Sequence, residues 1–141
     1  MDQKLVLDQF KAELLGALQH LKYSYGKVLK MSTDLTALSS EDLESWEGFA
    51  SRWARVSDIF IAKIMRARVL LGDPAFRGEM RDFVDQAEKI GLIDDADLWM
   101  KIREIRNQVA HEYLLKGVAP LLNQMRDLAP ILLSIEGKLK P

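Results

Sequence analysis

The chain has 141 residues, of which 48% are apolar, and its 20 lysines and arginines almost balance 21 acidic residues, so that the net charge is −1. This length provides apolar material for one core, so we expect a single domain over residues 1–141. The apolar content excludes an intrinsically disordered chain. The absence of cysteine excludes disulfides, cysteine-based zinc sites and thiol nucleophiles. With His20 and His111 as the two histidines, we expect no metal centre.

The start of the chain, Met1-Asp2-Gln3-Lys4, lacks the basic and then apolar layout of a signal peptide. No apolar run approaches the roughly 20 residues that a membrane-spanning helix needs. We therefore expect a cytoplasmic protein without membrane contact. The balanced charge excludes a protein coated with positive charge, but it allows a local basic patch.

Two long helices are predicted in the first half, because apolar residues recur there at steps of three and four. The first is expected over about residues 4–31. The second is expected to begin after an N-cap in Ser39-Ser40 and to end at Gly72-Asp73-Pro74. Their expected core stripes are Leu7, Phe10, Leu14, Leu18, Leu21, Tyr25 and Val28 in the first helix, and Trp46, Phe49, Trp53, Val56, Phe60, Ile64, Ala67 and Leu71 in the second.

The second half predicts shorter helices. Gly91 is expected to cap a third helix, Asp94-Asp95 to open a fourth, and Pro130 to kink or break a last apolar segment over 118–139. No stretch alternates with period two, so the expected fold is all-α, an antiparallel bundle of four or five helices. The expected stripes are Met80, Phe83, Val84, Ala87 and Ile90 in the third helix, and Leu98, Ile102, Ile105 and Val109 in the fourth.

Charge is unevenly distributed along the chain. The second helix and the following loop are rich in arginine, whereas acidic residues dominate over 82–97. Two solvated helix faces are the ordinary interpretation of such runs. The alternative is a strip of arginines that faces phosphates beside an acidic wall.

Residues 103–113 differ from the rest of the chain because they carry polar groups suited to chemistry. On an ideal helix with Ile105 in the core, Arg106 and Tyr113 lie at the edge of the buried stripe, and Asn107 and His111 lie farthest from it. Arg106 and His111 are then separated by about 140° around the axis and by about 7.5 Å along it. One straight helix aims this pair poorly at a single phosphorus atom.

Two arrangements bring the pair together: a distorted helix end near His111, or two copies that meet at a shared cleft in a two-fold dimer. Histidine can accept or donate a proton near neutral pH, so two histidines provide a base and an acid. Arg106 offers a permanent charge and a planar fork for phosphate oxygens. Asn107 could orient the imidazole or bind substrate.

The string Arg106-Asn107-Gln108-Val109-Ala110-His111-Glu112-Tyr113 resembles the Arg-Asn-x-x-x-His-x-Tyr signature of HEPN domains. It is most similar to HepT-like toxins, which are encoded beside minimal nucleotidyltransferases. The preceding segment Glu88-Lys89-Ile90-Gly91-Leu92-Ile93 is also similar to that family. The resemblance implies a HEPN-like homodimeric endoribonuclease that acts without metal or cofactor, with its active site at the dimer interface.

The same resemblance implies roles for individual residues. His111 acts as general base or acid while a ribose 2′-hydroxyl attacks the adjacent phosphate, and Arg106 stabilises the transition state. Arg103 and Asn107 are the supporting residues. Tyr113 corresponds to the tyrosine to which the nucleotidyltransferase antitoxin transfers AMP, and the added phosphates would block RNA by charge and volume.

Other interpretations stay open at this point. The chain could be a non-catalytic subunit that binds nucleotide or substrate for a nucleotidyltransferase, or a plain helical interaction module. Arg106 and His111 could belong to a solvated polar face, and Tyr113 could be a boundary tyrosine. His20 is expected to be exposed. Tyr23, Tyr25, Trp46 and Trp53 are interpreted as packing residues and not as platforms for RNA bases.

Overall fold

The computed structural model describes residues 2–112 and 119–139, without the side chains of Leu35 and of residues 110–112. Within these ranges the chain contains helices and connecting loops and no strand, which confirms the predicted all-α class. The helices are α1 (Gln3–Val28), α2 (Ser40–Asp58), η2 (Ile59–Met65), α3 (Arg66–Gly72), α4 (Met80–Lys89), α5 (Ala96–Glu112), α6 (Ala119–Leu133) and α7 (Ile135–Lys138), with a short 3₁₀ turn η1 (Leu35–Ala37).

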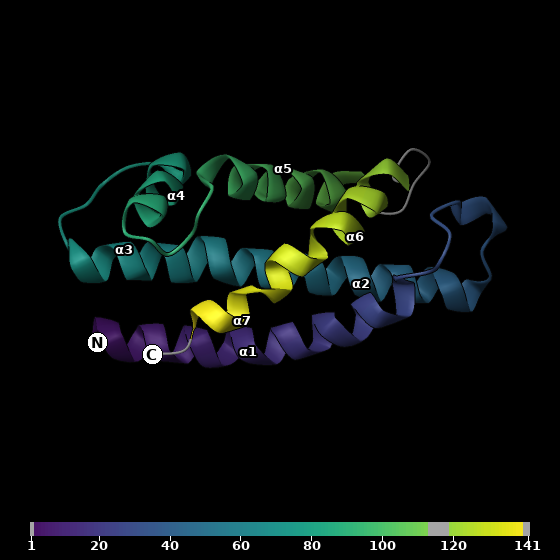
Figure 1. The fold of residues 1–141 in the computed structure, drawn as a ribbon, viewed down its shortest axis with the longest axis horizontal. Helices are drawn as coiled ribbons and strands as arrows, with labels where there is room; N and C mark the ends of the chain where they lie inside the picture. The colour runs from purple at the N-terminus through teal and green to yellow at the C-terminus, as the bar shows by residue number, and fades with distance from the viewer. Residues whose placement is uncertain (1, 113–118, 140–141) are drawn as a thin grey trace.

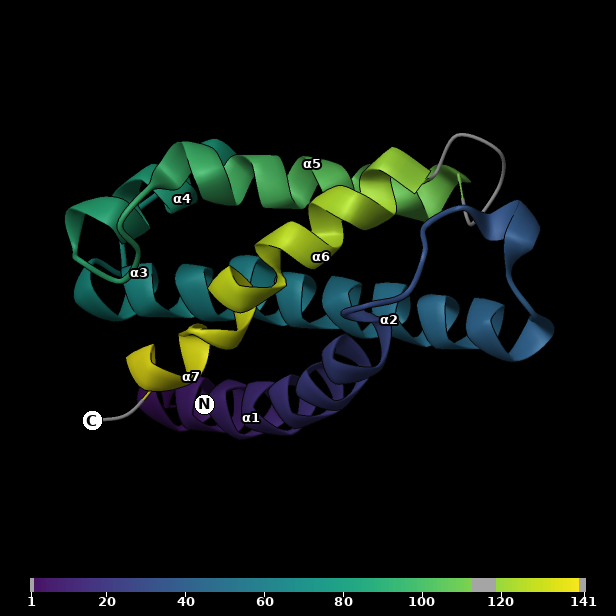
Figure 2. The same cartoon turned by 45° about the vertical axis from the view of Figure 1, so that its right-hand side comes forward.

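The helices form an elongated bundle around one long rod (Figures 1 and 2). The rod consists of α2, η2 and α3, which follow one another without a loop. Helix α1 runs antiparallel to it on one side, and α5 runs antiparallel to it on the other. Helix α6 crosses the rod diagonally and leads α7 back to the first turns of α1. This arrangement confirms a helical bundle, and no described helix is sufficiently long and apolar to cross a bilayer.

The core is built around large side chains that the rod directs inward. Trp46, Trp53, Phe49 and Phe60 are fully buried, as the helical spacing predicted. Trp53 Nε1 donates a hydrogen bond to the Met125 carbonyl at 2.9 Å, which ties α2 to α6. Both tryptophans are therefore core residues and cannot stack on RNA bases.

Local signals placed most helix ends correctly. The Ser39 hydroxyl caps α2 by accepting from the backbone N–H of Asp42 at 3.1 Å. Gly91 ends α4 with a φ of 81°, in the left-handed region that favours glycine. Helix α1 ends at Val28, three residues before the predicted end.

The π-helical segment η2 was not predicted, and it changes which residues face the core. A π turn closes i→i+5 hydrogen bonds and holds more residues than an α turn. The buried stripe therefore moves along the sequence: Met65 and Val69 are buried, whereas Leu71 is 41% exposed. The prediction that Leu71 lies in the core was wrong for this reason, because the spacing assumed an uninterrupted α-helix from α2 to α3.

Two further predictions about packing are corrected, and the break that Pro130 could have caused does not occur. Ile90 is 39% exposed, because it follows the last turn of α4 as its C-cap. Tyr23 is 65% exposed and does not pack, whereas Tyr25 is half-buried against the core. Pro130 does not break α6, which continues to Leu133.

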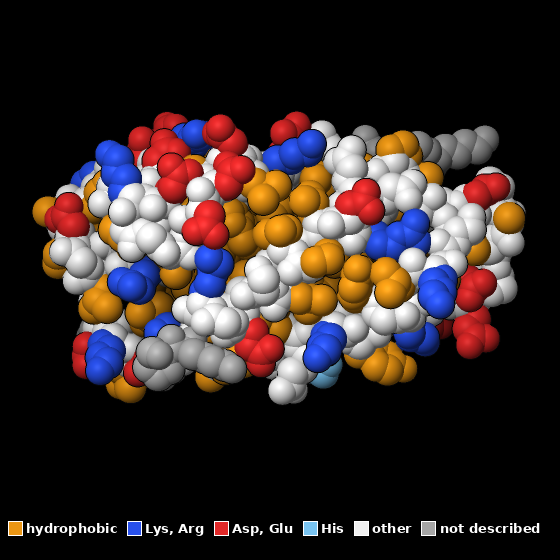
Figure 3. Space-filling model, in the orientation of Figure 1, with side chains coloured by type: hydrophobic (Ala, Val, Ile, Leu, Met, Phe, Trp, Pro, Cys, Tyr) orange, Lys and Arg blue, Asp and Glu red, His pale blue; other side chains and the backbone are white. Residues whose placement is uncertain are grey.

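The expected unevenness of charge is visible on the surface. Acidic side chains gather over α4 and the start of α5 (Figure 3). The arginines of this part of the chain have different neighbours. In the rod, Arg52 donates to Ser24 Oγ at 2.8 Å and Arg66 lies over an aromatic ring of α4, whereas Arg81 of α4 donates to Asp97 at 2.7 Å. They do not converge on one phosphate-facing strip, so the interpretation as ordinary helix faces fits better.

Candidate active site around Arg106

Helix α5 places three of the predicted site residues, Arg103, Arg106 and Asn107, beside its core stripe. Ile102, Ile105 and Val109 are buried, as expected. Arg106 follows Ile105 and is only partly exposed, because it lies at the edge of the buried stripe, next to the rod. The helical phase predicted for this segment is therefore confirmed as far as Val109.

Arg106 is held by Asp58, the last residue of α2. The guanidinium donates from Nε to Oδ1 at 2.7 Å and from Nη2 to Oδ2 at 2.8 Å. This is the bidentate geometry of a fork matched to a carboxylate. The hydrogen bonds from Asp58 raise the pKa of Arg106 above its ordinary value, against the desolvation that lowers it. Arg106 therefore stays positively charged throughout the range in which a protein works.

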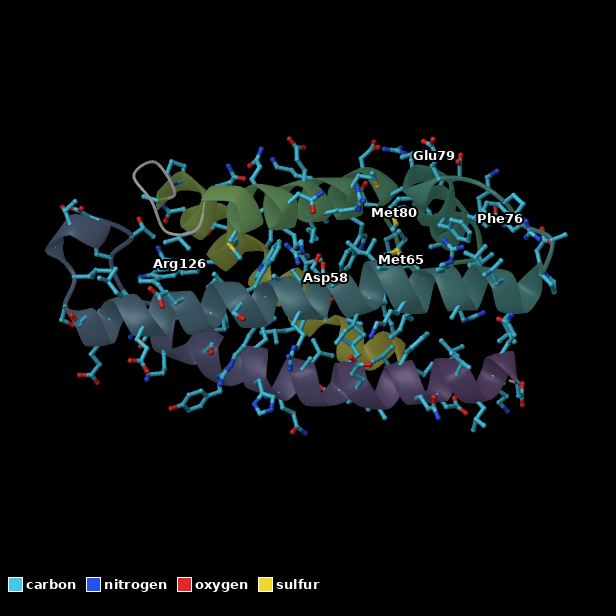
Figure 4. The ribbon with its side chains drawn as sticks, turned by 180° about the vertical axis from the view of Figure 1, so that it is seen from behind. Asp58, Met65, Phe76, Glu79, Met80 and Arg126 are labelled. Carbon is cyan, nitrogen blue, oxygen red and sulfur yellow. The ribbon has the colours of Figure 1, made fainter. Side chains whose placement is uncertain are left out.

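The paired residues border a cavity of about 380 Å³ between the rod, α4 and α5. Figure 4 shows Asp58 near the middle of the rod, on the side toward α5, and Met80 above Met65 farther along the rod. Two arginines against one carboxylate give this cavity a local excess of positive charge. The residues that line it are Ser57, Asp58, Ile61, Ala62, Met80, Arg103, Arg106 and Asn107.

The supporting residues predicted from the sequence lie at the same place. Arg103 is half-buried and Asn107 is exposed, and both line the cavity beside Arg106. They also line a second, more open cavity of about 670 Å³ on the outer face of α5. Arg103 and Asn107 therefore connect a groove against the rod with the outward face of the helix.

The described part of the structure does not place the two other predicted site residues, His111 and Tyr113, in the site. His111 belongs to α5, but its side chain lies outside the described residues. Tyr113 lies outside them entirely. The other histidine, His20, is exposed on α1, as expected, away from Arg106. The described part of the chain holds no cluster of three or more His, Asp and Glu side chains that could bind a metal ion.

The sequence interpretation missed Asp58. It lies 48 positions before Arg106, and no local pattern joins two such residues. One signal was available: Asp58 is a charged residue within the run Val56-Ser57-Asp58-Ile59-Phe60, whose other members are buried. A carboxylate flanked by core residues is positioned to pair with a cation from a neighbouring helix, and Asp58, with a side chain 48% exposed, does so at the edge of the core.

Comparison of the chain with protein-family models, with curated proteins and with solved structures finds no match. The residues around Arg106 and the signature of residues 106–113 are therefore the features that bear on its function.

Proposed function

We propose that the chain is an endoribonuclease of the HEPN type, which cleaves RNA by attack of a ribose 2′-hydroxyl on the adjacent phosphate. The observation that carries the proposal is the way Arg106 is held. Asp58 uses Nε and one N–H of Nη2, and an arginine has five N–H donors. The end of the guanidinium formed by Nη1 and Nη2 is left with donors that can bind two oxygens of a phosphate.

The charge at the site is suited to such a step. The attacked phosphate gains negative charge in the transition state, and donors already fixed in place stabilise it without reorganisation. Asp58 fixes Arg106 but also offsets its charge, so Arg103 on the same cavity restores the positive excess. Asn107 adds a neutral donor and acceptor at the same rim.

The proton transfers require histidine. One imidazole takes the proton of the 2′-hydroxyl as its oxygen bonds to phosphorus, and a second gives a proton to the departing 5′-oxygen. The products are a cyclic phosphate and a 5′-hydroxyl end. We assign these roles to His111 and to the same residue of a second copy. The outward cavity lined by Arg103 and Asn107 supports this arrangement, because a copy packed there would approach the groove beside Arg106.

Regulation by a cognate nucleotidyltransferase belongs to the same proposal. Tyr113 lies two residues after His111, so AMP units attached to its hydroxyl would place extra phosphates beside Arg106 and His111. They would repel RNA and occupy the anion-binding donors. Mixing the protein with ATP and the neighbouring nucleotidyltransferase should add AMP masses that Tyr113→Phe abolishes.

The decisive experiment is cleavage of tRNA and mRNA by the purified protein in buffer with a metal chelator. His111→Ala should lower the rate by about 10²-fold or more, the ordinary effect of losing a general base. Arg106→Ala should lower it by a similar factor. His20→Ala and Arg55→Ala are matched controls, because both residues are exposed and outside the cavity, and they should leave cleavage unchanged.

Cleavage that is equal in His111→Ala and His20→Ala would refute the assignment. Binding of nucleotide without any cleavage would instead select a non-catalytic subunit. A monomeric mass in light scattering would refute the proposed dimer, and with it the role of a second histidine.

A further inference from the structure

A third cavity lies far from Arg106, where the two ends of the fold meet. It has a volume of about 440 Å³ and is enclosed by α1, the η2–α3 end of the rod, the turn after α4, and α7. Figures 1 and 2 show α7 returning to the first turns of α1. We call it the α1–α7 pocket. It shares no described lining residue with the cavity beside Arg106.

The charges around the α1–α7 pocket are predominantly positive. Lys4 and Lys11 reach it from α1, Arg68 from α3 and Lys138 from α7, and Asp8 is the single carboxylate on its described lining. Four cations on one cavity are notable in a chain whose net charge is −1. Like charges repel one another, and a bound anion relieves that repulsion.

These cations form few ion pairs with other described side chains. Lys138 has one ion pair, with Asp94 at 3.7 Å, and the Asp94 side chain is 94% exposed, so this contact contributes little. Lys4, Lys11 and Arg68 form no ion pair with any side chain in residues 2–112 or 119–139. Packing and pairing within the described chain therefore do not explain their convergence.

The floor of the α1–α7 pocket is apolar. Leu7, Ile64, Leu92 and Leu139 line it, and each is less than a tenth exposed. Leu71, which is 41% exposed, lies at the edge. The cavity therefore combines cations with an aliphatic surface, which suits a ligand that has an anionic end and an apolar body.

We propose that the α1–α7 pocket binds a small amphipathic anion, with one phosphate or carboxylate at the cations and a short aliphatic body on the leucine and isoleucine floor. Its described lining contains no aromatic side chain, so it lacks the stacking platform that nucleic-acid bases prefer. This site is independent of the proposed ribonuclease activity, because neither its residues nor its ligand enters that reaction.

The test is isothermal titration calorimetry on the full-length protein with n-hexyl phosphate, n-hexanoate, inorganic phosphate and n-hexanol. The alkyl phosphate or the alkyl carboxylate should bind at least about tenfold more tightly than inorganic phosphate, because burial of each methylene adds affinity. Hexanol should bind more weakly than either alkyl anion. The relative affinities of hexyl phosphate and hexanoate identify the head group.

Variants locate the binding. The double variant Lys11→Gln/Arg68→Gln should weaken binding of the alkyl anion at least about tenfold. The matched control Lys22→Gln/Arg55→Gln removes two exposed cations from α1 and α2 and should have no effect. Leu71→Ser should weaken binding of the alkyl anion and leave that of inorganic phosphate unchanged. Circular dichroism should show that all three variants are folded.

The proposal is overturned if neither alkyl anion binds, or if both double variants bind it equally. It is also overturned if a short RNA binds in a manner that depends on Lys11 and Arg68 while the alkyl anions do not.

Discussion

The pairing of Asp58 with Arg106 gives a quantitative prediction. The two residues belong to different helices and are 48 positions apart in the chain. If the pair holds the guanidinium, removing either partner should cost stability, and removing the second should then cost little more. The variants Asp58→Ala, Arg106→Ala and the double variant form the cycle that isolates this coupling.

The geometry of the pair sets the coupling free energy that we expect between Asp58 and Arg106. The pair forms two short charged hydrogen bonds, at 2.7 and 2.8 Å, while the side chains of Arg106 and Asp58 are 28% and 48% exposed. Exposed ion pairs contribute about 0.2–1 kcal/mol, whereas loss of one partner from a buried pair costs about 3–5 kcal/mol. A half-exposed bidentate pair should fall between them, with a coupling free energy of about 1.5 kcal/mol.

A second ion pair, which joins Lys63 of the rod to Glu13 of α1, is a natural control. Lys63 and Glu13 approach only to 3.4 Å, and their side chains are 45% and 49% exposed. Their coupling should not exceed about 0.5 kcal/mol. Urea unfolding followed by tryptophan fluorescence would measure both cycles. A coupling for Asp58 and Arg106 no larger than that of the control pair would refute the claim that Asp58 fixes the guanidinium.

Three further outcomes are expected. Because the pKa of Arg106 is raised, its guanidinium keeps its charge across this range, so binding of 2′-O-methyl RNA, which cannot be cleaved, should be constant from about pH 7 to about pH 9; a loss of binding over that range would contradict this. Gly91→Ala should lower the free energy of unfolding by about 1 kcal/mol through backbone strain alone, because no atom lies within 4 Å of the new Cβ, whereas Gly26→Ala within α1 should raise it; equal effects in thermal unfolding would contradict this. Trp53→Phe should cost about 2–3 kcal/mol in urea unfolding, since it removes a buried hydrogen bond and leaves a cavity; a change below about 0.5 kcal/mol would show that this bond and its packing are dispensable.

The parts of this protein that the sequence could predict are those set by neighbouring residues. The spacing that puts Trp46 and Trp53 on one side of α2, the Ser39 cap and the left-handed Gly91 all depend on residues within a few positions of one another. The grouping of Arg103, Arg106 and Asn107 is of the same kind, because one helix places residues three and four apart on the same side.

The failures have an equally physical cause. Leu71 was misplaced because the π-helical turns of η2 shift the register of the rod, and such turns leave no periodic signal of their own. Pro130 was expected to kink or break the last apolar segment; it does not break the helix, because α6 continues past it to Leu133, with Ala129 and Leu132 buried on either side.

The sequence by itself determined an all-helical chain with one polar, histidine-bearing segment on its fourth predicted helix. Only the tertiary structure decided that Asp58 holds Arg106 and that lysines from α1 and α7 converge with Arg68 on one cavity. Helical periodicity reports which side of a helix is apolar, but it does not report which helix covers that side. Both sites are formed by segments distant in the chain, so they exist only once the rod, α1, α5 and α7 have packed together.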